Sequence, residues 1–148
     1  MHTSVCDLLG IEFPIFAFSH CRDVVAAVSK AGGLGVLGAV GLTPDALDVE
    51  LTWIEEQAGD KSFGVDVLVP AKYIGVEEGG MSPKDLVGLI PAEHRDFVNG
   101  LMDKYHVPPL PDDERLPSTA GAMSWSHKGA EPLMDVAFEH RIKLIANA

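Results

Sequence analysis

The feature that most constrains the fold is a strand-like stretch, a helical stretch and a second strand-like stretch that follow one another near the N-terminus. Residues 13–18 form an apolar run with β-type side chains, which is typical of a buried strand. A helix is predicted over residues 23–31, and Gly32-Gly33 ends it where a positive φ is allowed. Residues 34–40 are again apolar and rich in glycine. This order predicts a βαβ unit with parallel strands and a right-handed crossover.

The first predicted helix carries signals of its own. Val24, Val28 and Ala31 recur at helical spacing, with Val25 and Ala27 beside them, which predicts an amphipathic helix. Ser19 or Asp23 is the predicted N-cap, since either side chain can accept a hydrogen bond from a free backbone N–H. The helix should therefore begin close to the end of the first strand.

A second helix and a third strand follow at similar spacing. Thr43, with a proline and an aspartate behind it, predicts a helix start at residue 44, and Gly59 marks the end. The predicted apolar stripe of this helix consists of Leu47, Leu51, Ile54 and Ala58. Residues 63–69 are apolar apart from Asp66, as expected for a strand covered on both faces.

The alternation breaks over residues 71–131, which we interpret as a helical and loop insertion after the third strand. Within it, a helix is predicted to begin at Pro91, and the proline-rich residues 107–114 are predicted to be extended surface chain. A last helix over residues 131–140 and a fourth strand over residues 142–147 complete the pattern.

Repeated alternation of strands and helices predicts a parallel α/β fold. A closed (β/α)₈ barrel takes about 250 residues. This chain of 148 residues has only about half of the units of such a barrel. We therefore expect a single domain over residues 1–148 that is either an open four-stranded sheet or the front half of a TIM-type barrel.

The composition argues against several classes of partner. With 11 basic and 22 acidic residues, the formal net charge is −11, so nucleic acid and anionic membranes are poor partners. No run reaches the roughly 20 apolar residues of a membrane span, and the N-terminus has no signal-peptide pattern. Cys6 and Cys21 are interpreted as reduced cysteines of a cytoplasmic protein, and no histidine, aspartate and glutamate set has metal-site spacing.

Four motifs in this order resemble the N-terminal part of the nitronate monooxygenases, the 2-nitropropane dioxygenase family. They are LLGIEFPI at 8–15, VAAVSKAGGLG at 25–35, LTPDAL at 42–47 and FGVDVLVP at 63–70. The resemblance extends over residues 6–70 and 132–148. It implies an FMN-dependent TIM barrel of which this chain, incomplete with about four of eight strands, is the front part.

The resemblance implies that the substrate is a small molecule, an alkyl nitronate, which reduces FMN before O₂ reoxidises it. The flavin performs the electron transfer, while the protein supplies position, electrostatics and a base. The late strands of such barrels carry the phosphate-binding loops, and these are absent here. A partner chain or a missing C-terminal half would then complete the pocket.

Three positions depart from the family pattern. The loop over residues 17–22 is shorter than the family's loop and lacks its methionine. Asp66 stands where the family has an asparagine, and Asn147 stands where the family has its catalytic histidine.

Barrel active sites lie at the C-terminal ends of the strands, which selects the candidate residues. The candidate cofactor-binding residues are Ala17, Phe18, Ser19, Gly38 and Asp66. The candidate catalytic residues are His20, the titratable base nearest the first strand end, and Asn147, at the family's histidine position.

Each candidate also has a structural interpretation. Asp66 can serve the pocket or a structural ion pair, since an unpaired buried charge is costly. His20 can be a catalytic base or a solvated loop residue. Gly35 and Gly38 can serve close strand–helix packing or flavin approach. Residues 124–127 can form a lid over the pocket. We expect the remaining histidines that follow the third strand to lie on the surface, namely His94, His106 and His140.

Two further functions stay open. The chain can be a catalytically incomplete half-barrel, whose open sheet edges are a liability unless another chain pairs with them. Alternatively, related flavin barrels reduce enoyl thioesters with NAD(P)H, and a nicotinamide-driven flavin reduction would favour that reaction over nitronate oxidation.

Overall fold

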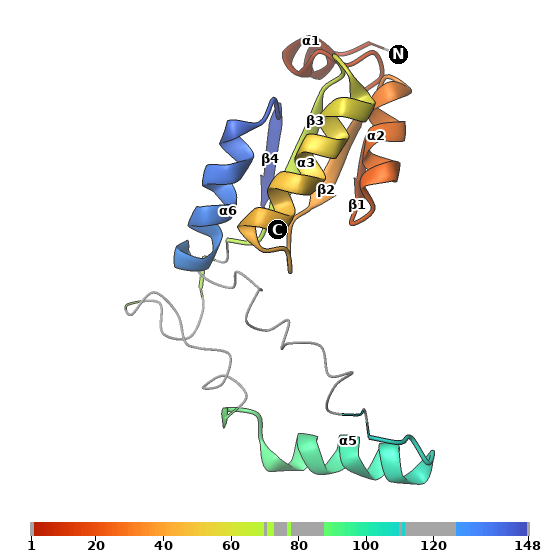
Figure 1. Cartoon of the computed structure of the whole chain (residues 1–148), viewed down its shortest axis with the longest axis vertical. Helices are drawn as coiled ribbons and strands as arrows, with labels where there is room; N and C mark the ends of the chain where they lie inside the picture. The colour runs from red at the N-terminus through yellow and green to blue at the C-terminus, as the bar shows by residue number, and fades with distance from the viewer. Residues whose placement is uncertain are drawn as a thin grey trace. The chain divides into compact units, whose positions relative to one another are not determined.

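The computed structural model describes residues 2–69, 71–72, 77, 88–109, 111 and 127–147. The chain divides into two compact units (Figure 1), one formed by residues 1–80 and 122–148 and the other by residues 81–121. The first unit contains the sheet and every predicted site residue. The predicted lid over residues 124–127 and half of the predicted extended segment, residues 110 and 112–114, lie outside the residues whose side chains are described.

The first unit alternates strands and helices, as the sequence predicts. In chain order its elements are α1 (Ser4–Leu9), β1 (Phe16–Ser19), α2 (Arg22–Lys30), β2 (Leu34–Gly38), α3 (Pro44–Ala58), β3 (Phe63–Val67), α6 (His127–Glu139) and β4 (Leu144–Asn147). The strands form one sheet in the order β1-β2-β3-β4, and every neighbouring pair is parallel. This confirms the predicted parallel α/β fold.

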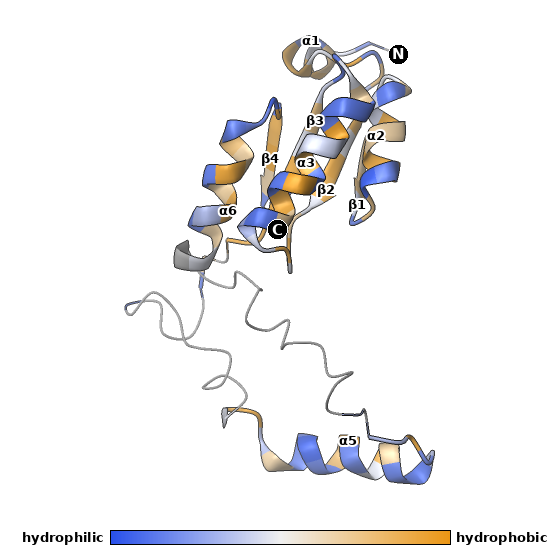
Figure 2. Ribbon diagram, viewed as in Figure 1, coloured by the Kyte–Doolittle hydropathy of each residue, from blue (hydrophilic) through white to orange (hydrophobic). Residues whose placement is uncertain are grey.

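One face of the sheet packs on three helices. Figure 1 shows α2, α3 and α6 on the same side of the sheet, and we call this side the three-helix face. Figure 2 shows strands that are mostly apolar beneath helices whose polar and apolar residues alternate. The core on this side includes Val25 from α2, Leu37 from β2, Leu47, Leu51 and Ile54 from α3, Phe63, Val65 and Val67 from β3, and Leu133 and Ala137 from α6.

The opposite face of the sheet packs on α1, and we call it the α1 face. Leu34 and Val36 of β2 form a second core there with Cys6, Leu9 and Ile11, and Leu144 and Ala146 of β4 pack against it. Because side chains alternate along a strand, Gly38 lies on the same face as Val36. Its register partner Asp66 and the next partner, Ala146, share that face.

The second helix follows the prediction closely. The side chain of Thr43 caps α3 by accepting a hydrogen bond from the backbone N–H of Ala46 at 3.2 Å, and a proline holds the first turn. Its predicted apolar stripe, Leu47, Leu51, Ile54 and Ala58, is buried. Here local capping signals and periodicity were sufficient because they agreed.

The buried side of the first helix is rotated from the predicted spacing of Val24, Val28 and Ala31 toward Val25, which the sequence places beside it. Val24 is 44% exposed, whereas Val25 is fully buried and Ser29 is 1% exposed. Gly35 explains the rotation: a Cβ at this position would overlap the backbone of Val25, so its absence lets α2 lie directly on β2. The hydroxyl of Ser29 accepts a hydrogen bond from the Gly35 N–H at 3.2 Å, which secures the contact.

The predicted N-caps of the first helix are also wrong. Cys21 is the N-cap of α2, with no side-chain cap. The Ser19 hydroxyl accepts instead from the Cys21 N–H at 3.0 Å, and the Asp23 carboxylate lies 3.6 Å from the Cys21 thiol. Both side chains therefore shape the loop before the helix rather than its first turn.

Several element boundaries differ from the predictions. The second and third strands end at residues 38 and 67 instead of 40 and 69, and the fourth begins at residue 144 instead of 142. The helix α1 was not predicted, although Cys6 and Leu9 stand three residues apart on its buried side and Gly10 ends it at φ 67°. The first strand starts at Phe16, since the N–H groups of residues 12 and 13 donate to the Gly32 carbonyl instead of the ladder. The last helix starts four residues before the predicted Glu131, so it contains Pro132.

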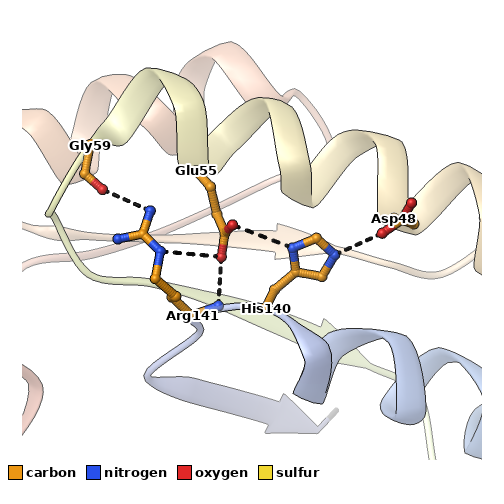
Figure 3. Close-up of polar contacts among 5 residues, drawn as sticks. All are labelled: Asp48, Glu55, Gly59, His140 and Arg141. Atoms are coloured by element: carbon orange, nitrogen blue, oxygen red, sulfur yellow. Dashed lines mark hydrogen bonds and ion pairs between the residues drawn. The ribbon is translucent and has the colours of Figure 1, made fainter.

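A polar network joins α3 to the end of α6 (Figure 3). The ring of His140 lies between two carboxylates, with Nε2 3.0 Å from Asp48 and Nδ1 3.7 Å from Glu55. Glu55 also accepts from the backbone N–H of Arg141 at 2.6 Å, and the Arg141 guanidinium donates to the Gly59 carbonyl at 3.0 Å. The His140 side chain is 8% exposed, so the predicted surface position of His140 is wrong.

The second unit is described by one helix, α5 (Ala92–Lys104). Pro91 precedes its first turn, as predicted, and occupies the N-cap position. None of the residues of α5 is buried. His94 and His106, which lie in and just after this helix, are exposed.

Candidate active site

The carboxyl ends of the four parallel strands lie at one edge of the sheet. Parallel α/β proteins bind their ligands at this edge, because the loops there are free to vary while the strands hold them. The seven predicted site residues all lie in the last three residues of a strand or in the loop that follows it. The structure divides them between the two faces of the sheet.

The ring of His20 lies over Gly38, the last residue of β2. Its Nδ1 is 3.2 Å from the Gly38 carbonyl oxygen. A Cβ on Gly38 would come within 2.6 Å of two ring atoms of His20 and 2.7 Å of Phe18 Cζ. Gly38 therefore leaves the space that the imidazole occupies, on the α1 face of the strand ends.

The rings of Phe18 and His20 support one another. They meet edge to face, with centroids 5.0 Å apart and planes at 82°. Such T-shaped pairs are favourable because the edge of one ring points at the electron-rich face of the other. Phe18 is 57% exposed, so it offers an apolar aromatic surface at the sheet edge.

Asp66 is the buried charged group of the site. It is 9% exposed and pairs in register with Gly38, on the same face as the His20 ring. Within the described part of the chain, no hydrogen bond or salt bridge reaches its carboxylate. Burial raises the pKa of Asp66 because it disfavours the charged form, and the nearby charge of His20 partly lowers it.

Asn147 lies in a different setting from Asp66. It pairs in register with Val67, on the three-helix face. Its side-chain oxygen accepts from the Val69 N–H at 2.7 Å, and its amide donates to the Val69 carbonyl at 3.3 Å. The side chain thus ties the end of β4 to the chain that leaves β3.

Ala17 and Ser19 also lie on the three-helix face, since their register partners are Gly35 and Leu37. The residues that the structure brings together are Phe18, His20, Gly38 and Asp66, on the α1 face. We call these four residues the strand-end site.

Sequence reasoning selected every member of the strand-end site but missed the link between His20 and Asp66. The two residues are 46 positions apart, and a loop residue has no strand periodicity from which its direction could be read. The one usable signal was Gly38: a glycine in the middle of three adjacent strand ends marks a place where another group approaches closely.

The arrangement can accept and hold protons. An imidazole next to a buried carboxylate is a typical acid–base pair, and the exposed Phe18 ring can contact a planar apolar ligand. The pKa of Asp66 is displaced by desolvation and by a specific charge partner, which is a mark of functional sites. Among the described residues, no group of three or more histidines, cysteines and acids is placed to hold a metal ion.

Comparison with known proteins gives a coherent set of matches. The family model described as nitronate monooxygenase matches residues 2–77. A Mycobacterium tuberculosis protein named "Putative monooxygenase Rv1533" is 57% identical over 148 residues, which is 100% of this chain and 39% of that protein. A Staphylococcus saprophyticus protein named "Probable nitronate monooxygenase" is 35% identical over 82 residues, 53% of this chain and 23% of that protein.

A solved structure shares the fold. The nitroalkane oxidase of Streptomyces ansochromogenes superposes with a TM-score of 0.55 at 20% identity, over 98% of this chain and 35% of that chain. The matches therefore cover only 39%, 23% and 35% of the length of these three proteins. In the part of the chain that the structure describes, no helix has the length and apolar character to cross a membrane.

Proposed function

Because the chain belongs to the nitronate monooxygenase family, we propose that it contributes to the FMN-dependent oxidation of alkyl nitronates by O₂. The observation that carries the proposal is the strand-end site, at the sheet edge where such folds hold their ligands. There the buried Asp66 carboxylate lies near a histidine and receives no hydrogen bond from any residue that the structure describes. An unsatisfied buried carboxylate costs free energy, and a ligand that donates a hydrogen bond to it would recover part of that cost.

The residues present fit the ring of a flavin. The Asp66 carboxylate can accept from a ring N–H, the Phe18 ring is an exposed apolar surface, and Gly38 adds no bulk between them. Backbone groups of Ala17 and Ser19 lie at the same strand end. The described strand ends thus provide the ring side of a pocket, while late strands hold the phosphate in such barrels.

When bound, FMN supplies the redox chemistry, since it takes an electron pair from the substrate and passes it to O₂. The chain supplies position and proton handling. His20 is the proposed catalytic base, because its imidazole is the titratable group beside the pocket wall. A catalytic role for Asn147 stays a proposal, in which its amide would act only after releasing the backbone of Val69.

The sheet edges support a role for additional strands in this function. In the described structure, β1 pairs only with β2, and β4 pairs only with β3. Phe16 and Phe18 of β1 are 48% and 57% exposed. Unpaired edges with apolar side chains favour pairing with further strands. Light scattering on the purified chain checks this, because a well-behaved monomer would argue against pairing with another chain.

The proposed function can be tested with the purified chain. FMN is titrated into the protein while quenching of its fluorescence is followed, and O₂ uptake is then measured with propane-2-nitronate. We expect saturable quenching and nitronate-dependent O₂ uptake. A chain that leaves FMN fluorescence unchanged at every concentration would overturn the proposal for this chain. Bleaching of the flavin by NADPH, without nitronate turnover, would instead favour enoyl-thioester reduction.

A matched pair of variants separates the site from the rest of the fold. Asp66→Ala removes the buried carboxylate and should weaken FMN binding at least several-fold, since charged hydrogen bonds contribute about 1.5–3 kcal/mol. Glu56→Ala removes an exposed carboxylate of α3 and should leave binding unchanged. Equal effects of the two substitutions would contradict a specific role for Asp66.

A further inference from the structure

The contact between His20 and Gly38 determines which ring nitrogen carries the proton. A backbone carbonyl oxygen can only accept a hydrogen bond, so the Nδ1 that lies 3.2 Å from it must be the donor. In the neutral ring the other nitrogen, Nε2, then has no proton and keeps a lone pair. The backbone of β2 therefore sets His20 up as a proton acceptor at Nε2.

Asp66 lies on the neighbouring strand, on the same face as this ring. Gly38 is its register partner, and the His20 ring occupies the space into which a Gly38 side chain would project. The described carboxylate has no hydrogen bond to compete with the histidine, and the charge of His20 acts on it. The ring over Gly38 and the carboxylate of its register partner Asp66 thus lie on the same face of the sheet, at neighbouring positions.

The other charged groups of the loop after β1 are turned to different partners. Arg22 pairs with Glu50 at 3.2 Å and lies over the ring of Trp53. Asp23 faces the thiol of Cys21. In the described part of the chain, His20 is the charged group whose field acts on Asp66.

We propose that His20 and Asp66 form one coupled acid–base pair, in which Nε2 of His20 accepts a proton from a bound weak acid and Asp66 is the positioning residue that stabilises the resulting imidazolium. The X–H bond of the ligand breaks, its electron pair stays on the ligand, and the proton moves to Nε2. The positive charge formed on the ring then lies near the Asp66 carboxylate, so the pair as a whole carries no net charge.

The identity of the weak acid rests on the proposed function, but the pair itself does not. It is a property of the folded chain without ligand, and it depends on the negative charge of the carboxylate. An amide could not stabilise an imidazolium by charge. The pair can therefore be tested in the ligand-free protein.

The first experiment measures the titration of Asp66 by NMR. The side-chain carboxyl carbon of Asp66 is assigned by its loss in Asp66→Asn and followed with pH in the ligand-free chain. Replacing His20 with glutamine removes the charge that lowers the pKa of Asp66, so we expect the Asp66 titration to move to higher pH. An unchanged titration in His20→Gln would overturn the coupling.

Two further variants control this measurement. His2→Gln removes a histidine that pairs with Asp7 at the N-terminus and should leave the Asp66 titration unchanged. Gly38→Ala keeps the imidazole but puts a methyl group where the ring lies, so it should move the titration in the same direction as His20→Gln. If His20→Gln moved the Asp66 titration and Gly38→Ala did not, the position of the ring over Gly38 would not be required for the coupling.

The second experiment reads the tautomer directly. Nitrogen-15 spectra of the ring above its titration should show His20 protonated at Nδ1, because Gly38 offers only an acceptor. A ring protonated at Nε2 would overturn the proposed direction of proton transfer. If the Asp66 titration responds to His20→Gln in a chain that does not bind FMN, the acid–base pair is supported and the proposed flavin function fails. If the chain binds FMN but the titration does not respond, the flavin function is supported and the pair fails.

Discussion

The molecule contains two histidine–carboxylate arrangements that differ in how well their charges are matched. Between α3 and α6, the His140 ring faces Asp48 and Glu55, and Glu55 also holds the backbone and side chain of Arg141. At the strand ends, the Asp66 carboxylate is 9% exposed and no hydrogen bond reaches it within the described structure. The charged groups of the first arrangement are paired with one another, whereas the Asp66 carboxylate has no hydrogen-bond donor among the described residues.

The difference shows what each region contributes. A network in which each polar group has a partner stabilises the packing of α6 on α3, because removing one member would leave the others without a hydrogen-bond partner. A buried carboxylate without hydrogen bonds destabilises the fold, and such groups persist where a site needs them. The network between α3 and α6 therefore contributes to stability, whereas Asp66 at the strand ends is a candidate for a functional role.

The strongest test of this comparison is removal of Glu55. Glu55→Ala leaves the Arg141 N–H and one side of His140 without an acceptor, so the free energy of unfolding should fall by about 1–3 kcal/mol. Urea unfolding followed by circular dichroism measures the change. The exposed neighbour Glu56, replaced by alanine, is the control and should change the stability little. Equal losses in both variants would show that the network does not stabilise the packing.

Removal of the Asp66 charge should act in the opposite direction. Asp66→Asn removes a buried ionisable group, so the free energy of unfolding at pH 7 should rise by about 0.5–2 kcal/mol, the usual size for a single stabilising substitution. A variant that is less stable than the parent chain would mean that Asp66 has a structural partner.

The pH dependence of stability should separate the two regions further. Burial raises the folded-state pKa of Asp66 above its ordinary value, so the folded state binds a proton more tightly than the unfolded state. The stability from this group is fully present below the unfolded pKa and is lost as pH rises through the folded pKa. Unfolding measured across this acidic window should show that Asp66→Asn lacks this loss.

The smallest effect is expected at the exposed side of the network. Asp48 contacts His140 at 3.0 Å, but its own side chain is 56% exposed to solvent. Asp48→Asn should therefore lower the free energy of unfolding by no more than about 0.5–1 kcal/mol, and added salt should reduce the difference. A loss as large as that of Glu55→Ala would show that both carboxylates are equally important to the network.

Local patterns were enough to predict most of the fold. The proline-led start of α3, its apolar stripe and the glycine after it gave the helix within its observed bounds, because capping and periodicity agreed. They failed for α2, where Val24 fits the helical spacing but Val25 is buried. There the contact with Gly35 decided the rotation of the helix, and that contact joins two elements.

The candidate site was predicted only in part, because local patterns locate the strand ends but not the contacts between elements. Strand ends can be located from sequence, so Asp66 and Gly38 were selected correctly as residues of the edge. The face on which Asn147 lies depends on its register with β3, and the partners of His140 come from a helix about 90 positions earlier. Neither contact leaves a local pattern in the chain.

By itself, the sequence determined the alternation of strands and helices, the parallel sheet and the family, because these follow from periodicity, turn residues and ordered motifs along the chain. Only the tertiary structure decided that His20 lies over Gly38 beside Asp66, whereas His140 is enclosed by Asp48 and Glu55. The physical reason is that the state of a charged group depends on its burial and on the charges around it. Both are set by residues far away in sequence, once the strands and helices have packed.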